Sequence, residues 1–80
     1  MEHNLRRTDT IKLRQVMIER GYLTVQSLSR ASGINRNTLG DILSGKAQPT
    51  YGVMNKIITT LDLSDIQAGQ IFFATDLRDA

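Results

Sequence analysis

Residues Leu23 to Lys46 read LTVQSLSRASGINRNTLGDILSGK, and this stretch decides the fold. Thr24 and Asn35 are residue types that cap the N-termini of helices, whereas Gly33 and Gly45 stand where helices end. The stretch is therefore predicted to form two short helices joined by a glycine turn.

Each of the two predicted helices has one side suited to packing. In the first, Leu28 and the small Ser29 and Ser32 share a side at helical spacing, so a neighbouring helix can approach closely. In the second, a rotation of about 100° per residue separates an inner apolar stripe from an outer arc. The inner stripe consists of Leu39, Ile42 and Leu43. The outer arc consists of Arg36, Asn37, Gly40, Asp41 and Ser44. This pattern indicates a helix-turn-helix whose second helix presents hydrogen-bonding groups to a partner.

The stretch resembles the Cro/C1-type, or lambda-repressor-like, helix-turn-helix family of phage repressors and their bacterial relatives. In that family a leucine, a small residue, a glycine, a polar N-cap and a Gly-Lys ending recur in a fixed order. The matching residues here are Leu28, Ser29, Gly33, Asn35 and Gly45-Lys46. The resemblance covers roughly residues 10 to 66. It implies an all-α fold: a compact five-helix DNA-binding domain in which helices 2 and 3 form the helix-turn-helix.

A first helix is predicted before this stretch. Thr8 or Thr10 is expected to cap it, and it should run to Arg20 with Gly21 closing it. Its buried side is expected to consist of Ile11, Leu13, Val16 and Met17.

One departure from the family suggests a direct contact between the first and third helices. Many members join these helices by a partly buried arginine–glutamate pair, and the matching positions here are the apolar Met17 and Leu43. Because exchanging a buried ion pair for apolar groups of similar size is often neutral or stabilising, the fold should tolerate the exchange. Met17 and Leu43 are predicted to be in contact.

Two further helices are predicted after the stretch. Pro49 forbids helix and Thr50 caps the fourth helix. Its apolar residues at helical spacing are Val53, Met54, Ile57, Ile58 and Leu61. Ser64 and Gln67 form a capping box for the fifth. The fifth helix carries Ile66, Ile71, Phe72 and Phe73. The two phenylalanines either complete the monomer's core or form a dimer interface, and an extended tail that pairs with a second copy is a third option.

These elements divide the 80 residues into a flexible N-terminal arm (1–7), the helix-turn-helix domain (8–73) and a C-terminal tail (74–80). So small a core should gain from dimerisation. The chain contains no cysteine, and its one histidine, His3, has no partner for a metal site. No cofactor or metal is therefore expected. No apolar run approaches the roughly 18 residues of a membrane span, and no signal-peptide core is present. We expect a soluble, cytoplasmic protein.

Charge is distributed unevenly along the chain. Residues 1–56 contain nine Lys or Arg and four acidic residues, a balance of +5, whereas residues 57–80 contain one and four, a balance of −3. The half that carries the helix-turn-helix is thus basic, which favours attraction to phosphates. Arg6 and Arg7 either reach along a DNA backbone or are solvated surface, the commoner role of such pairs.

The predicted site follows from what the family's function requires. Side chains near the start of a recognition helix meet base edges in the major groove, while flanking groups hold phosphates. Arg36 could form a bidentate contact with a guanine, and Asn37 could form one with an adenine. The base-reading residues are predicted to be Arg36, Asn37, Gly40 and Asp41. The phosphate-binding residues are predicted to be Asn35, Thr38, Ser44, Lys46 and Gln48.

Three residues argue against tight DNA binding. Val25 stands where the family commonly has a phosphate-binding glutamine at the start of helix 2. Gly40 lies in mid-helix, which costs up to about 1 kcal/mol relative to alanine. The Asp41 carboxylate repels phosphates unless it accepts a hydrogen bond from a cytosine N4 amine or pairs with a basic side chain such as that of Arg36.

Two classes of function remain open. The first is a sequence-specific transcriptional regulator of the phage or prophage Cro or repressor type, a homodimer on a double-stranded DNA operator. The second is a protein-interaction module of the same fold, such as an anti-repressor that binds a partner repressor or an antitoxin that covers a toxin. No paired carboxylates, nucleophile–histidine set or phosphate loop can be assembled, so catalytic residues are not predicted and an enzyme is not expected.

Overall fold

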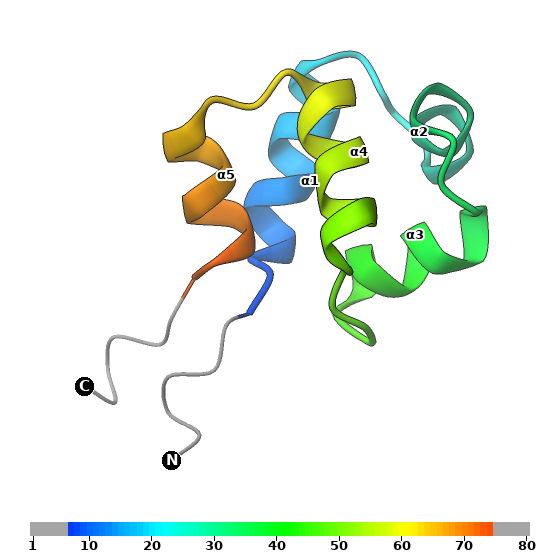
Figure 1. The fold of residues 1–80 in the computed structure, drawn as a ribbon. Helices are drawn as coiled ribbons and strands as arrows, with labels where there is room; N and C mark the ends of the chain where they lie inside the picture. Colours follow the sequence, from blue (N-terminus) through cyan, green and yellow to red (C-terminus); the bar gives the residue numbers. More distant parts are fainter. Residues whose placement is uncertain (1–6, 75–80) are drawn as a thin grey trace.

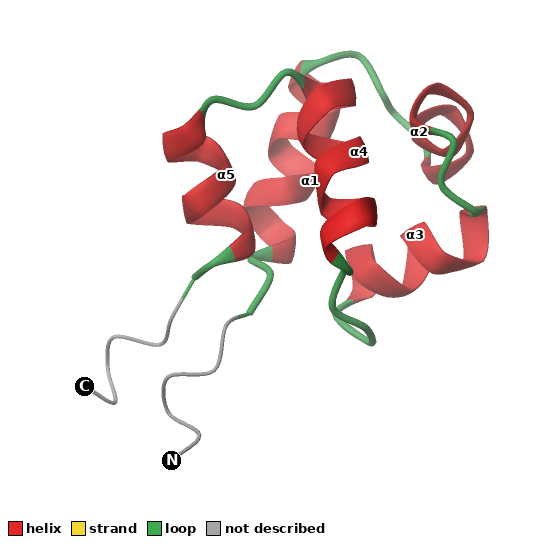
Figure 2. Ribbon diagram, viewed as in Figure 1, coloured by secondary structure: helices red, strands yellow, loops and turns green. Residues whose placement is uncertain are grey.

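The structure is a computed structural model that describes residues 7–74. This part of the chain forms five α-helices and no β-strand (Figure 2). The helices are α1 (Thr10–Glu19), α2 (Val25–Ser32), α3 (Arg36–Ser44), α4 (Tyr51–Leu61) and α5 (Asp65–Phe72). Helices α2 and α3 lie at one end of the molecule, α5 lies at the other, and α1 and α4 stand between them (Figure 1). The predicted all-α, five-helix fold is confirmed.

Side-chain caps begin α2, α3, α4 and α5 where the sequence predicts them. The Thr24 hydroxyl accepts a hydrogen bond from the Ser27 amide at the start of α2. The Thr50 hydroxyl accepts from the Val53 amide at the start of α4. Ser64 and Gln67 form the predicted capping box of α5, in which each side chain accepts from the other's backbone amide. Each cap satisfies amide groups that a helix leaves without an intrahelical partner.

The start of α1 differs from the prediction. Asp9, and neither Thr8 nor Thr10, is the N-cap, and its carboxylate accepts from the Lys12 amide at 3.0 Å. Thr8 is engaged instead by Gln48, which is distant in sequence. The helix ends at Glu19, one residue before the predicted Arg20. A charged cap next to the positive end of the helix dipole is favourable, which explains why the aspartate serves here.

One hydrophobic core joins all five helices and the two links Ile34 and Leu63. It includes the three predicted inner residues of α3, three of the five predicted for α4 and three of the four predicted for α1, and the other two of α4, Val53 and Ile58, are partly buried against it. Its members are Leu13, Val16, Met17, Leu28, Ile34, Leu39, Ile42, Leu43, Met54, Ile57, Leu61, Leu63, Ala68, Ile71 and Phe72. Ile11 was predicted to be buried but is 71% exposed. Because the buried side of α1 is centred on Leu13, Val16 and Met17, the helical rotation turns Ile11 and Ile18 to solvent.

The two adjacent phenylalanines have different environments. Phe72 is fully buried and completes the core of the monomer, as the first of the three options for this end required. Phe73, at the C-cap of α5, is 44% exposed, and Ile66 at the start of the helix is also exposed. Ala74 pairs with Arg7 of the same chain in an isolated antiparallel bridge. The rest of the predicted arm, with His3 and Arg6, and the rest of the predicted tail lie outside the described residues.

Helices α1 and α3 pack against each other, whereas the direct contact between Met17 and Leu43 stays a prediction. Both side chains are buried members of the same core, and the Arg14 guanidinium (Nε) donates to the carbonyl of Leu43 at 3.1 Å. The register of α1 against α3 is therefore consistent with the one used to identify the exchange. Among the described residues, no helix has both the length and the apolar character needed to cross a membrane.

Candidate nucleic-acid interface

The turn between α2 and α3 sets the angle at which α3 leaves the core. Gly33 ends α2 in the left-handed conformation, with φ of 76°, which glycine adopts without steric cost. Ile34 then inserts into the core. Its carbonyl accepts from the Ser29 hydroxyl and its amide donates to the Ser32 hydroxyl. Small polar side chains at the end of α2 therefore fix the turn, and with it the direction of α3.

Asn35 begins α3 as its N-cap. The side-chain carbonyl accepts from the backbone amides of Asn37, at 2.8 Å, and Thr38, at 3.3 Å. These two amides are thus occupied within the chain, and the remaining hydrogen-bonding group of the cap is its NH₂, a donor. Asn35 can serve as a cap and as a phosphate donor at the same time.

The outer side of α3 is accessible to a partner. Leu39, Ile42 and Leu43 are buried beneath it. Of the predicted base-reading residues, Arg36, Asn37 and Asp41 are exposed and Gly40 is half-buried, while the predicted phosphate residues Thr38 and Ser44 are exposed beside them. The structure thus brings these six residues onto one helix and leaves their side open to solvent.

Gly40 has no packing reason to lack a side chain. A Cβ built at this position meets no atom within 4 Å, and its backbone is helical. Nothing among residues 7–74 accounts for the glycine.

Asp41 does not form the ion pair with Arg36 that the sequence left open, since none joins them in the described part of the chain. Five residues along a helix rotate a side chain by about 140°, whereas pairs form at spacings of three or four. The backbone carbonyl of Asp41 accepts from the amides of Lys46 and Ala47. Its carboxylate remains on the exposed side of α3.

The C-terminal end of α3 holds the other predicted phosphate residues. Gly45 turns the chain with φ of 85°, after which Lys46 is exposed. The Ser44 hydroxyl donates to the Asp41 carbonyl at 3.2 Å, so its hydrogen has a partner within the helix. The side-chain carbonyl of Gln48 accepts from the amide and the hydroxyl of Thr8. Lys46 is therefore the residue of this group whose side chain is most clearly available to an anion.

Two arginines, Arg14 and Arg20, make structural contacts. Arg14 donates to the Leu43 carbonyl in the last turn of α3, and Arg20 donates to the Leu61 carbonyl in the last turn of α4, at 2.8 Å. A cation at a helix C-terminus satisfies carbonyls and opposes the negative end of the dipole. Arg14 thus supports the helix that carries the candidate site. No local pattern could reveal these contacts, because the partners lie 29 and 41 residues away.

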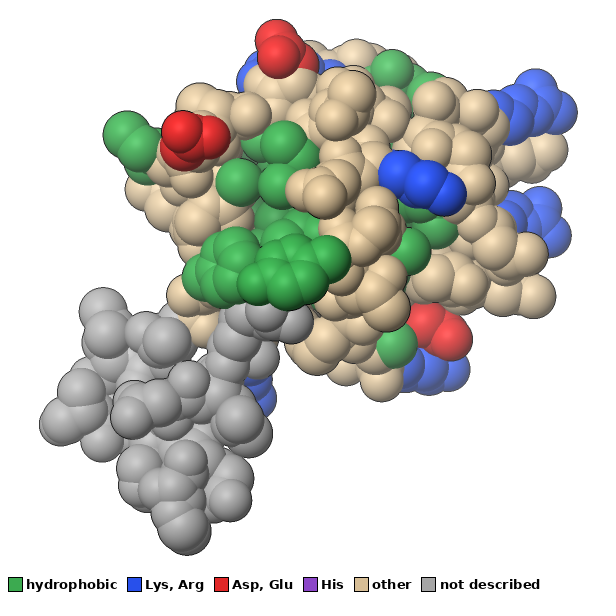
Figure 3. All heavy atoms as spheres, viewed as in Figure 1, with side chains coloured by type: hydrophobic (Ala, Val, Ile, Leu, Met, Phe, Trp, Pro, Cys, Tyr) green, Lys and Arg blue, Asp and Glu red, His purple; other side chains and the backbone are tan. Residues whose placement is uncertain are grey.

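Charge separates over the surface in the way the sequence indicates. On the face shown in Figure 3, lysine and arginine side chains lie mainly over α2, α3 and α4, whereas acidic side chains lie over the start of α5 and the link before it. An acidic side chain also stands near α3, where Asp41 is exposed. Among residues 7–74 no group of three or more His, Cys, Asp or Glu could hold a metal ion.

Comparison with known proteins gives one match. A family model described as a Cro/C1-type HTH DNA-binding domain matches residues 12–70, which include α2, α3 and α4 entirely and most of α1 and α5. No curated protein and no solved structure matches the chain.

Proposed function

The chain belongs to the Cro/C1-type helix-turn-helix DNA-binding domain family, and on this premise we propose that it is a sequence-specific transcriptional regulator of the phage or prophage type that inserts α3 into the major groove. The observation that carries the proposal is the outer side of α3, where polar side chains are exposed above a fully buried apolar stripe. A recognition helix needs this division, because one side holds it to the domain while the other meets base edges.

The first turn of α3 supplies the base-reading groups. Arg36 forks onto the N7 and O6 acceptors of a guanine, and Asn37 reads the N6 and N7 groups of an adenine. Asp41, one turn further on, accepts from a cytosine N4 amine, which is the arrangement that tolerates a carboxylate in the groove. Gly40 lets the backbone of α3 come close to the DNA.

The ends of α3 supply the phosphate contacts. At the N-terminal end, the NH₂ group of Asn35 and the hydroxyl of Thr38 donate to one strand. At the other end, the Lys46 ammonium and the Ser44 hydroxyl contact the backbone, and Gln48 offers the NH₂ of its side chain. Such contacts fix orientation and supply the affinity that depends on salt.

The regulator acts as a homodimer on two half-sites about 34 Å apart, the spacing of one DNA turn. Exposed apolar side chains support association of this domain with another protein surface. Ile11 and Ile18 occupy the outward side of α1, and Ile66 is exposed on α5. Large exposed apolar groups on a small domain are typical of interfaces.

Salt dependence tests the phosphate assignment. We expect wild-type affinity to fall linearly with salt on a log–log plot, and Lys46→Ala to flatten the slope by about one because one phosphate contact is lost. The measurement is fluorescence anisotropy of labelled operator DNA over a series of salt concentrations. Lys56→Ala, which removes an equal charge from the exposed middle of α4, is the control. Equal slopes for both variants would refute a contact by Lys46.

Gly40→Ala is expected to separate stability from binding. An added methyl meets no neighbour, so the free energy of unfolding should rise by about 0.5–1 kcal/mol, while the methyl should hold α3 away from the groove and weaken DNA binding. Gly69→Ala is the matched control, because Gly69 is helical, half-buried and equally open on α5. Urea denaturation and DNA titration of both variants provide the test. If Gly40→Ala binds DNA as well as Gly69→Ala does, the backbone of α3 does not approach the groove closely.

The exposed apolar residues also favour a second candidate, an anti-repressor or antitoxin-like module that binds a partner repressor or toxin. A gel shift with DNA that flanks this chain's coding region distinguishes the two, run with and without any repressor that is encoded beside it. Retardation of the DNA by this chain alone supports the regulator. If the chain retards no DNA and instead removes the shifted band of the neighbouring repressor, the module is supported.

A further inference from the structure

Three hydrogen-bonded contacts fix the segment that precedes α1. The amide of Arg7 donates to the Ala74 carbonyl at 3.1 Å, and the amide of Asp9 donates to the Ile71 carbonyl at 2.7 Å. Between them, the amide and the hydroxyl of Thr8 both donate to the side-chain carbonyl of Gln48, at 3.0 and 2.9 Å. Residues 7–9 are thus held between the end of α5 and the link that joins α3 to α4.

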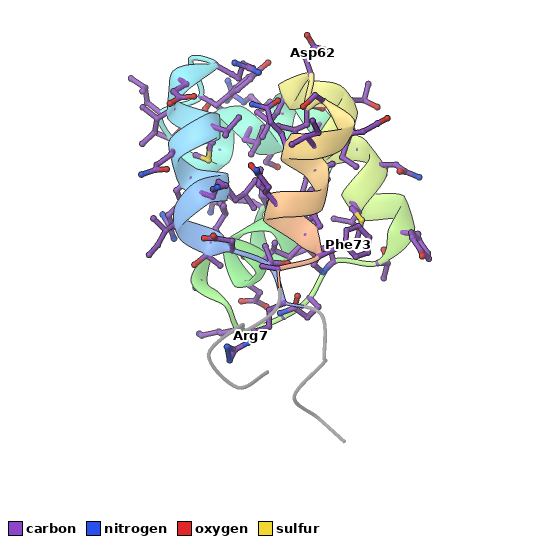
Figure 4. All side chains as sticks on the ribbon, turned by 90° about the vertical axis from the view of Figure 1, so that its left-hand side faces the viewer. Arg7, Asp62 and Phe73 are labelled. Atoms are coloured by element: carbon purple, nitrogen blue, oxygen red, sulfur yellow. The ribbon has the colours of Figure 1, made fainter. Side chains whose placement is uncertain are left out.

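The Thr8–Gln48 contact unites two segments that lie 40 residues apart in sequence. Gln48 follows Lys46 by two residues, in the link that leaves α3 at the end assigned to phosphate contacts. Arg7 precedes Thr8 directly and is exposed. In Figure 4 Arg7 lies at the end of the molecule opposite Asp62, near the green segment that joins α3 to α4. The contact therefore places a second cation on the edge of the molecule that already carries Lys46.

We propose that Arg7 contacts the DNA phosphate backbone next to the end of α3, and that Gln48 is the positioning residue that holds Arg7 there through Thr8. The inference rests on the proposed DNA-binding function. It replaces the direct phosphate contact assigned to Gln48 by a positioning role, because the side-chain carbonyl of Gln48 accepts from Thr8. An arginine held by bonded backbone on both sides of the segment loses less freedom on binding than one on a loose arm. The guanidinium then supplies a charge-assisted bond to phosphate.

The first test is the salt dependence of DNA affinity. Arg7→Ala is expected to flatten the log–log slope by about one, as loss of one phosphate contact requires, and to weaken binding to all sequences equally. Lys56→Ala, which removes one charge from α4, is the matched control and should leave the slope nearly unchanged. If Arg7→Ala leaves affinity and slope at the wild-type values while Arg36→Ala weakens binding, Arg7 makes no contact and the inference is overturned.

A double-mutant cycle tests the positioning role. Gln48→Ala should weaken binding in the wild-type chain but have little further effect in Arg7→Ala, because Gln48 acts through the residue already removed. If Gln48→Ala weakens binding by the same factor in both backgrounds, Gln48 contacts DNA by itself and the positioning role is overturned. Thr8→Val, which keeps the amide donor and removes the hydroxyl donor, should give a smaller loss in the same direction.

Circular dichroism and urea denaturation of each variant confirm that it is folded, and Thr8→Val replaces Gln48→Ala in the cycle if the latter does not fold. Failure of the inference is distinguishable from failure of the proposed function. If wild-type protein binds operator DNA with dependence on Arg36 while the cycle is additive, only the inference fails. If the wild-type protein binds no DNA, both fail.

Discussion

Phe72→Ala is expected to lower the free energy of unfolding by about 3–5 kcal/mol. Phe72 is fully buried at the end of α5 and belongs to the same core as Leu13 of α1 and Leu39 of α3. Removal of its ring leaves a cavity that the surrounding helices can fill only in part. Since small domains have about 5–15 kcal/mol of stability in total, this one change should remove a large share of it.

Phe73→Ala is the matched control, because it removes the same ring from the next residue. Phe73 is 44% exposed, so less apolar area returns to water and the loss should be about 1–2 kcal/mol. Urea denaturation followed by circular dichroism measures both variants. Equal losses would mean that the two rings contribute alike and that the core does not end at Phe72.

The parts of this fold that could be predicted from the sequence are those that depend on neighbours within one helical turn. Thr24, Asn35 and Ser64 cap helices as expected, because a cap bonds to amides only two or three residues away. Gly33 and Gly45 end α2 and α3 with positive φ for an equally local reason. The buried stripe of α3 follows from helical rotation alone.

Features that depend on distant partners could not be predicted. The sequence predicts Thr8 or Thr10 as the cap of α1, whereas Asp9 between them is the cap, and Thr8 contacts Gln48 across 40 residues instead. The apolar side chain of Ile11 predicts a core position, yet only the packing of α1 against α3 and α5 decides which side of α1 faces inward. Asp62 ends α4 with φ of 54°, a conformation that glycine adopts more readily.

The candidate site also contains features that local neighbours determine and features that distant partners determine. The exposure of Arg36 and Asn37 follows from the period of α3 and was predictable. The contact of the Ser44 hydroxyl with the Asp41 carbonyl is also local, since the two residues are three positions apart. The partner of Gln48 could not be predicted, because Thr8 lies 40 residues away. The roles of these residues toward DNA stay predictions, and the one with the largest expected effect concerns Arg36.

Arg36→Ala is expected to lower discrimination for one guanine in each half-site by about 1–3 kcal/mol, which is roughly a 5- to 150-fold loss in the ratio of affinities. Arg36 is the first residue of α3 and is exposed, so no internal contact should be lost and the fold should be unaffected. Competition binding of the operator against a variant with that guanine replaced measures the ratio. In the wild type the replacement should weaken binding, and in Arg36→Ala it should have little effect.

Arg36→Lys separates base reading from charge. Lysine keeps the positive charge, so the salt dependence should stay near that of the wild type, whereas the planar fork that matches the two guanine acceptors is lost and discrimination should fall. Lys46→Ala should behave in the opposite way, with a flatter salt slope and unchanged discrimination. If Arg36→Lys keeps full discrimination, or if Arg36→Ala lowers affinity for both DNA sequences equally, Arg36 contacts the backbone. The first turn of α3 would then owe its specificity to Asn37 or to the shape of the DNA.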